Sequence, residues 1–404
     1  MKRWKKIALL LLSLVLLSQV PFVYRRYKLG RLRAAIDQLN LQRVASSNPG
    51  DFVEYKGVMH VHSFLGGHST GSFADIIAAA KVNQLNFVVM TEHPSKDFDT
   101  AAMTLRGVHG GVLFVNGNEI ATTNQDRLLV LPGDETAAAA SSFSAADLLA
   151  QEKAKRALAF VAYPQEFKAW NAGNFDGIEV YNVFTNTRKL NYFVTLFDGL
   201  WSYRSYPDLL FATFYERPGE SLKLWDDQMV ASDRRLTATA GNDAHANVGL
   251  SLNDSSGKTI MGIKLDPYER SFSLVRMHVL VPRNNAFDTE NLLSALRDGH
   301  CFISFDLFGD TTGFTFSATN GIEQRIQGDE ISLGTGVHLG VNTPIKGRIV
   351  LLKNGNVVGE ESAALSKEFS ITEKGFYRVE VYLPQLPKPV SAQPWIISNP
   401  ISVR

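Results

Sequence analysis

Segments with the patterns of β-strands and α-helices alternate along this chain between residues 57 and 305. The helical periodicity of residues 73–84 is followed by an apolar strand-like run at 86–90, and residues 145–156 are followed in the same way by 158–162. Strands that alternate with helices are typical of α/β folds with a parallel sheet. We therefore expect an α/β architecture, with a (β/α) barrel as the leading candidate.

The pattern changes beyond about residue 310, where no stretch with helical periodicity follows. Residues 348–352 and 357–358 flank an Asn354-Gly355 pair, which supplies the positive φ angles of a tight hairpin turn. Further strand-like runs follow, so we expect a small β-sandwich at the C-terminal end. The predicted parts are an N-terminal helix with its linker (1–48), an α/β barrel (49–310) and a β-sandwich (311–404).

Basic residues flank an apolar run at residues 7–24, with four Lys or Arg before it and five soon after it. The run is about as short as a membrane-spanning helix can be. A cleaved signal peptide has a similar pattern, but no convincing small-x-small cleavage site is present. Positive charge on both sides does not orient the segment. We expect an uncleaved anchor in a bacterial inner membrane with the body on the extracytoplasmic side; a secreted or periplasmic protein is the alternative.

Composition narrows the class of partner. Hydrophobic residues make up 45% of the 404 residues and charged residues 20%, which is typical of a globular protein. The net charge of +1 does not favour nucleic acid, so we expect a small-molecule substrate. Cys301 is the single cysteine, which excludes an intramolecular disulfide and a cysteine-rich zinc site.

Four of the nine histidines fall between residues 60 and 93. His60 and His62 lie two apart on a predicted strand, so both imidazoles point to the same face and can reach one metal ion. His68 lies in the glycine-rich loop 66–71, and His93 ends the next strand. Alone, the His-x-His pair is weak evidence, because two surface or core histidines are about as common. Its place at the end of a predicted barrel strand, where active-site groups project, favours a metal site.

Further candidate ligands end other predicted strands. Glu119 follows Gly117-Asn118, and Asp243 and His245 lie two apart in Asn242-Asp243-Ala244-His245. Carboxylates beside imidazoles suit Zn²⁺, Mn²⁺ or Fe better than Ca²⁺, and a carboxylate can bridge two ions. The remaining histidines have no partner at ligand spacing and are expected to be structural or exposed: His109, His278, His300 and His338.

These motifs resemble those of the PHP (polymerase and histidinol phosphatase) metallohydrolases, over residues 57–305. The resemblance rests on Met59-His60-Val61-His62-Ser63, His68, Thr91-Glu92-His93, Gly117-Asn118-Glu119 and Asn242-Asp243-Ala244-His245. The segments 295–299 and 394–400 resemble the subgroup that contains the carbaryl hydrolase CehA and its relative McbA. The resemblance implies a distorted seven-stranded β/α barrel that holds up to three metal ions.

The resemblance also implies ligand sets. One ion would take His60, His62, Glu119 and Asp243, and a second would take His68, His93 and His245. A third would be bridged by Glu119, but Tyr163 and Asp126 stand where the family has histidines. A carboxylate can bind a hard ion, whereas a neutral phenol is a poor ligand. We therefore expect two divalent ions per chain, Zn, Mn or Fe.

The expected activity is hydrolysis by a metal-activated water, and no Gly-x-Ser-x-Gly nucleophile motif is present. The wider resemblance favours phosphate esters, while the subgroup favours carbamate, ester or amide bonds. A basic group near the metals would favour phosphate, and an apolar aromatic pocket would favour the other bonds. Trp170, Trp201 and Trp225 could line such a pocket, although packing is the commoner role. A degenerate barrel that binds without turnover is a further alternative.

Overall fold

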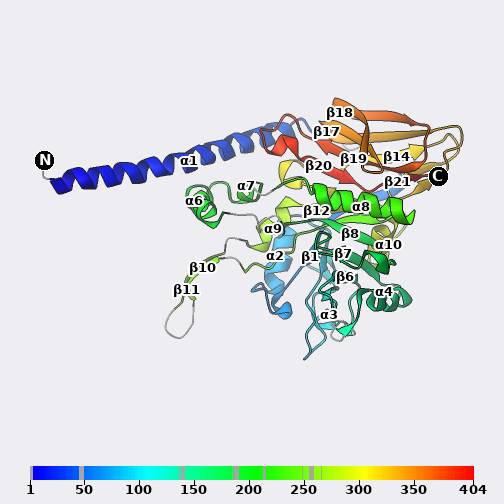
Figure 1. Ribbon diagram of the computed structural model, residues 1–404, viewed down its shortest axis with the longest axis horizontal. Helices are drawn as coiled ribbons and strands as arrows, with labels where there is room; N and C mark the ends of the chain where they lie inside the picture. Colours follow the sequence, from blue (N-terminus) through cyan, green and yellow to red (C-terminus); the bar gives the residue numbers. More distant parts are fainter. Residues whose placement is uncertain are drawn as a thin grey trace.

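The computed structural model describes residues 3–44, 50–135, 137, 142–183, 185, 191–212, 215–247, 249–253, 259–264 and 266–404. It shows a mixed α/β body from which one long helix projects (Figure 1). The description below covers these residues.

The N-terminal helix α1 (Arg3–Asn40) runs without interruption through Pro21. Its apolar half stands away from the body (Figure 1), and an 18-residue window of it has a mean hydropathy of 2.2 with 6% of the window buried. The second half packs into the main hydrophobic core through Leu29, Leu32, Ile36 and Leu39. By length and composition α1 could cross a membrane, and a signal sequence would pass the same test.

Two sheets form the centre of the body. In the first, β1 (Phe52–Val61), β2 (Phe87–Met90) and β4 (Val112–Val115) are parallel, while β3 (Gly107–His109), β12 (Arg276–Pro282) and β13 (Cys301–Ser304) join antiparallel. In the second, the order is β5 (Asn118–Ala121), β6 (Arg127–Leu131), β7 (Leu158–Ala162), β8 (Gly177–Asn182) and β9 (Thr237–Gly241). Only the β7-β8-β9 part of this second sheet is parallel.

The mixed direction of the strands differs from the expected parallel sheet. Only residues 122–126 connect β5 to β6, and a parallel connection needs a crossover of a dozen or more residues. The two strands therefore pair as an antiparallel hairpin. The prediction of an α/β fold is confirmed, and that of a parallel sheet holds for part of the strands.

The two central sheets meet beside the ends of β1 and β2. Isolated bridges join Val61 to Ala244 and Glu92 to Asn118. Backbone hydrogen bonds from His62 N to Ala244 O (3.1 Å) and from Glu119 N to Glu92 O (3.2 Å) reinforce these junctions. Strand ends that are far apart in the sequence are thereby held together, while closure into a seven-stranded barrel stays a prediction.

Helices cover these sheets. Ser72 and Asp75 form a capping box at the start of α2, and Gly299 ends α10 in the left-handed conformation (φ 74°). The helices are α2 (Phe73–Val82), α3 (Thr100–Met103), α4 (Ala145–Ala154), α6 (Tyr192–Ser202), α7 (Pro207–Ala212), α8 (Gly219–Ser232), α9 (Tyr268–Leu274) and α10 (Thr289–Asp298). Short 3₁₀ helices lie at Phe64–Gly66, Trp170–Ala172, Asp306–Phe308 and Val390–Ala392. Strands β10 (Gly249–Asn253) and β11 (Thr259–Lys264) form a separate antiparallel pair.

The C-terminal part consists of strands, as expected. The long hairpin of β17 and β18 turns at Asn354 (φ 50°) and Gly355 (φ 80°), which confirms the predicted Asn-Gly turn. Strand β20 pairs with β13, so the C-terminal strands continue the first sheet. The division at residue 310 and the sandwich stay predictions. The strands are β14 (Thr315–Thr319), β15 (Gln324–Ile326), β16 (Glu330–Ile331), β17 (Val337–Lys353), β18 (Asn356–Ile371), β19 (Gly375–Tyr382), β20 (Pro394–Ser398) and β21 (Ile401–Val403).

Candidate metal centre

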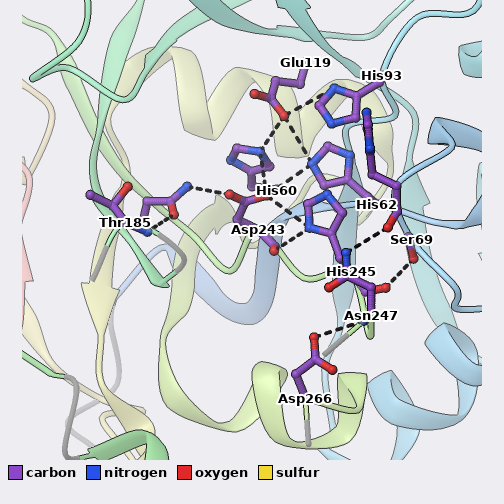
Figure 2. Close-up of polar contacts among 12 residues, drawn as sticks. His60, His62, Ser69, His93, Glu119, Thr185, Asp243, His245, Asn247 and Asp266 are labelled. Atoms are coloured by element: carbon purple, nitrogen blue, oxygen red, sulfur yellow. Dashed lines mark hydrogen bonds and ion pairs between the residues drawn. The ribbon is translucent and has the colours of Figure 1, made fainter. Parts of the chain in front are cut away.

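Histidines and carboxylates from four strands converge where the two sheets meet (Figure 2). His60 and His62 come from the end of β1, and Glu119 comes from β5. His93 follows β2, and Asp243 follows β9. The backbone of His60 (φ 61°) and of Asp243 (φ 47°) lies in the left-handed region, which costs a non-glycine residue about 1–3 kcal/mol. Strain of this kind clusters at functional sites, because the surrounding structure has to hold it in place.

Four of these residues form a compact group in which the ligand atoms all lie within 4.8 Å of one another: His60, His62, Glu119 and Asp243. Glu119 Oε2 lies 3.2 Å from His60 Nε2 and 3.3 Å from His62 Nε2. Asp243 Oδ1 lies 3.5 Å and 3.4 Å from the same two nitrogens. All four side chains are buried. These four residues are the set that the PHP resemblance implies for the first ion, and their binding of an ion stays a prediction.

The polar atoms of this group fit a bound cation. Both ring nitrogens of His62 and the Oδ1 atom of Asp243 are buried and have no hydrogen-bond partner among the described residues. Such an unsatisfied atom costs about 1–3 kcal/mol, so native proteins rarely leave several together. A divalent ion bound between His62 Nε2 and Asp243 Oδ1 would satisfy both atoms. Imidazole nitrogens with carboxylate oxygens are a donor set for Zn²⁺, Mn²⁺ or Fe.

A second group of possible ligands consists of His62, His93 and His245. The ring of His62 stacks against both others, with centroid distances of 4.5 Å to His93 and 4.3 Å to His245. His68 is exposed and lies edge-on to His93 at 5.3 Å, but it belongs to neither group. The structure thus brings His93 and His245 together as predicted, while the part of His68 in a second ion site stays a prediction.

Tyr163 and Asp126, the candidates for a third site, form hydrogen bonds with different partners. Tyr163 donates a hydrogen bond from its hydroxyl to Asp243 Oδ2 at 2.6 Å. Burial, and then the charge of Asp243, raise the pKa of Tyr163, so the phenol stays protonated. The carboxylate of Asp126 accepts from the backbone N of Lys168 at 2.5 Å. The site thus has Tyr163 as a hydrogen-bond donor at its edge, and Asp126 is engaged elsewhere.

Sequence reasoning missed two charged residues at the site. Glu179 Oε2 accepts from His60 Nδ1 at 2.7 Å, which leaves Nε2 of this histidine for an ion. Asn182 in turn donates to Glu179 Oε1 at 2.7 Å. Arg127 donates from Nη1 to Glu119 Oε1 at 2.6 Å, and its guanidinium lies 5.7 Å from the ring centroid of Tyr163. Glu179 left one signal in the sequence, since a carboxylate inside an apolar strand is rare unless it is paired.

Without an ion, the pKa shifts differ among the candidate ligands. Burial would lower the pKa of His60 and of His62, but the carboxylates beside them raise it. Burial would raise the pKa of Glu119, but its close contacts with the imidazoles of His60 and His62 hold it well below its usual range. Burial, together with the charge of His62, lowers the pKa of His93 and of His245 to about 4. At neutral pH the carboxylate is therefore charged and these two imidazoles are neutral, which is the state in which each binds a metal.

Residues around the ligands fix the loops that carry them. Tyr268 of α9 donates to the backbone O of His62 at 2.5 Å, and its hydroxyl lies 2.8 Å from Ser69 Oγ. The carboxylate of Glu92 accepts from the backbone N of Ser63 at 3.0 Å and from the hydroxyl of Thr104 at 2.8 Å. Each loop is thus held by a buried side chain that is itself not a member of either ligand group.

The remaining histidines and tryptophans have other roles. His278 is fully buried between Glu54 (2.6 Å) and Asp306 (3.3 Å), as a structural histidine should be. Trp225 is also fully buried and donates to a backbone carbonyl, so it packs rather than lines a pocket. The other histidines lie outside both ligand groups: His109, His300 and His338.

Comparison of the sequence with protein families gives no match, and comparison with curated proteins gives none. Similar solved structures include a two-domain protein of Bacteroides vulgatus that contains a predicted PHP-like metal-dependent phosphoesterase (12% identity, 89% of this chain and 98% of that chain, TM-score 0.39). A second is PsfC of Pseudomonas syringae (14% identity, 62% of this chain and 91% of that chain, TM-score 0.36). A third is the lesion-specific endonuclease EndoQ of Pyrococcus furiosus (11% identity, 61% of this chain and 56% of that chain, TM-score 0.36). Likenesses of this size establish neither a family nor an activity.

Proposed function

We propose that this protein is a metal-dependent hydrolase of the PHP type that cleaves phosphate esters. The observation that carries the proposal is the buried group of His60, His62, Glu119 and Asp243, whose ligand atoms lie within 4.8 Å of one another. In this group His62 and Asp243 retain buried polar atoms without a hydrogen-bond partner in the described chain. A group arranged only for stability would satisfy such atoms internally.

Different residues would hold the ions and orient the residues that hold them. His60, His62, Glu119 and Asp243 would hold one ion, and His93 and His245 would hold a second together with His68 or His62. A bound divalent ion lowers the pKa of a coordinated water towards 7 and neutralises charge that develops on the substrate. Glu179 keeps His60 in the tautomer whose Nε2 faces the group. Tyr163, protonated and bonded to Asp243, orients this carboxylate.

Arg127 favours phosphate over a neutral carbamate or ester. Its guanidinium is bonded to Glu119, yet its side chain remains 39% exposed, so donors are left for an anionic substrate. A fixed positive charge beside the ligands is the feature that distinguishes the two substrate classes. Carbamate, ester or amide hydrolysis of the CehA kind remains the second candidate, because it would use the same ions.

The metal assignment is tested on the full chain purified in detergent. His60→Ala combined with Asp243→Ala should remove one ion per chain by elemental analysis and abolish hydrolysis. His338→Ala with Asp310→Ala, which changes the same residue types away from the site, should alter neither. Unchanged metal stoichiometry in the first double variant would overturn the ligand set.

The substrate class is tested with a generic phosphomonoester and a generic carboxylester. Arg127→Gln should lower kcat/KM for the phosphoester by roughly 10- to 100-fold, the value of a charge-assisted hydrogen bond. It should change the carboxylester rate much less. Arg348→Gln on β17 is the matched control. Equal losses on both substrates would favour the carbamate, ester or amide alternative, and binding without turnover of either would favour a degenerate barrel.

A further inference from the structure

Helix α6 exposes large apolar side chains on one side. Leu196 is 47% exposed and Leu200 is 73% exposed, and these two leucines lie one helical turn apart. Trp201 follows them and is 38% exposed. Neighbouring exposed apolar side chains of this size indicate a surface that contacts a membrane or another molecule.

Specific contacts hold α6 against the end of the apolar half of α1. The rings of Phe22 and Phe197 stack at a centroid distance of 5.1 Å. Trp201 Nε1 donates to Gln19 Oε1 at 3.0 Å, and Arg25 pairs with Asp198 at 2.6 Å. These contacts place α6 level with residues 19–25 of α1, and Figure 1 shows it beside the middle of that helix.

The exposed apolar run of α1 ends at the level of α6. Leu16 and Leu17 precede the segment of α1 that binds α6 and are 61% and 65% exposed, and Val20 within that segment is 57% exposed. Basic residues begin at Arg25, where the apolar run ends. Tryptophan and tyrosine are enriched at this level of membrane proteins, where the acyl region meets the headgroups. Trp201 on α6 and Tyr24 on α1, which is 56% exposed, both lie there.

We propose that α6 is an interfacial helix, whose Leu196, Leu200 and Trp201 insert into the surface of the bilayer in which α1 is anchored. The occupant is lipid because the patch lies level with the end of the candidate span, where the basic residues begin. A cleaved signal peptide would lose the residues of α1 that hold α6. The inference rests on α1 as the anchor and is independent of the proposed hydrolysis.

The interfacial helix is connected to the metal centre. Just beyond the end of α6, the ring of Tyr203 lies 4.1 Å from the guanidinium of Arg270 on α9. The same helix α9 carries Tyr268, which bonds to the backbone of His62. Contact of α6 with lipid therefore places the ligand-bearing end of β1 near the membrane surface.

The test uses the full chain, reconstituted in vesicles of phosphatidylcholine and phosphatidylglycerol, with a spin label on a single introduced cysteine. Cys301 is fully buried and burial raises the pKa of its thiol, so it does not compete for the label. The label is placed at Leu200→Cys, and the control is Val230→Cys on α8, which is 49% exposed. Relaxation by oxygen, which partitions into lipid, is compared with relaxation by a water-soluble nickel chelate.

We expect the label at residue 200 to favour oxygen over nickel by several-fold, and the label at residue 230 to show the reverse. Equal nickel access at the two positions would overturn the inference while leaving the anchor intact. Protection of residue 200 from both reagents would also overturn it, because it would indicate a protein contact. A full chain that does not float with the vesicles would overturn the anchor and the inference together.

Discussion

Glu179→Gln should weaken metal binding without disturbing the fold. The carboxylate lies 2.7 Å from His60 Nδ1, and both side chains are at most 1% exposed, so the interaction is fully desolvated. Glutamine has nearly the same shape and can still accept the hydrogen bond, but it removes the charge that makes the opposite nitrogen a stronger donor to a metal. The loss of such a support typically costs 10- to 100-fold in metal affinity. This corresponds to about 1.4–2.7 kcal/mol, at 1.36 kcal/mol for each factor of ten.

The assay is a competition titration of Zn²⁺ or Mn²⁺ between the full chain in detergent and a chelating dye. The control is Glu152→Gln on α4, since Glu152 is also buried and bonds to Lys155 at 3.0 Å away from the ligands. The Tm of each metal-free variant shows whether the fold is retained. If Glu179→Gln binds the ion as tightly as the unaltered chain and the Glu152→Gln control, Glu179 does not support a ligand.

Three further outcomes are expected. Tyr163→His should raise the metal content per chain only together with Arg127→Gln, because the guanidinium bonded to Glu119 repels a third cation; elemental analysis of the single and double variants decides this. Burial would lower the pKa of His278, but Asp306 and Glu54 raise it to about 9. The protonated imidazole therefore stabilises the folded state fully below pH 6.5, and this stabilisation is lost as the pH rises towards 9. Between pH 6.5 and 9 the Tm of His278→Asn should therefore fall less than that of the unaltered chain. Plots of Tm against pH that run parallel for the two proteins would contradict the raised pKa of His278. A chain that begins at residue 49 should melt well below one that begins at residue 25, because four buried side chains of α1 contribute about 1.5–3 kcal/mol each, and equal Tm values would show that α1 does not stabilise the body.

The ligands could be predicted from the sequence because strand geometry carries the information locally. His60 and His62 are two apart, as are Asp243 and His245, and each pair follows an apolar run long enough to be recognised as a strand. Ends of neighbouring strands meet at one edge of a sheet, so these residues could be named as candidate ligands. Their grouping around one ion was implied by the resemblance to the PHP motifs and not by strand geometry.

Glu179 and Arg127 could not be found in this way, because their roles depend on which strands are neighbours. Glu179 faces His60 only because β9, the partner of β8, also contacts the end of β1. Arg127 lies on β6, which runs antiparallel to β5 because the connection between them is short. The periodicity of the sequence did not indicate this hairpin. The pairing of β20 with β13 joins residues almost a hundred positions apart, and no local pattern specifies it.

The unbroken course of α1 into the core fixes the position of the body relative to this helix. The helix packs into the core of the body through Leu29, Leu32, Ile36 and Leu39, so the body cannot move independently of a membrane anchor formed by α1. On the proposal that α1 anchors a hydrolase in the membrane, the body would travel in two dimensions with its metal centre at a constant height, whereas a body on a flexible stalk would sample a hemisphere. Its substrates would then be selected partly by where their scissile bond stands above the bilayer.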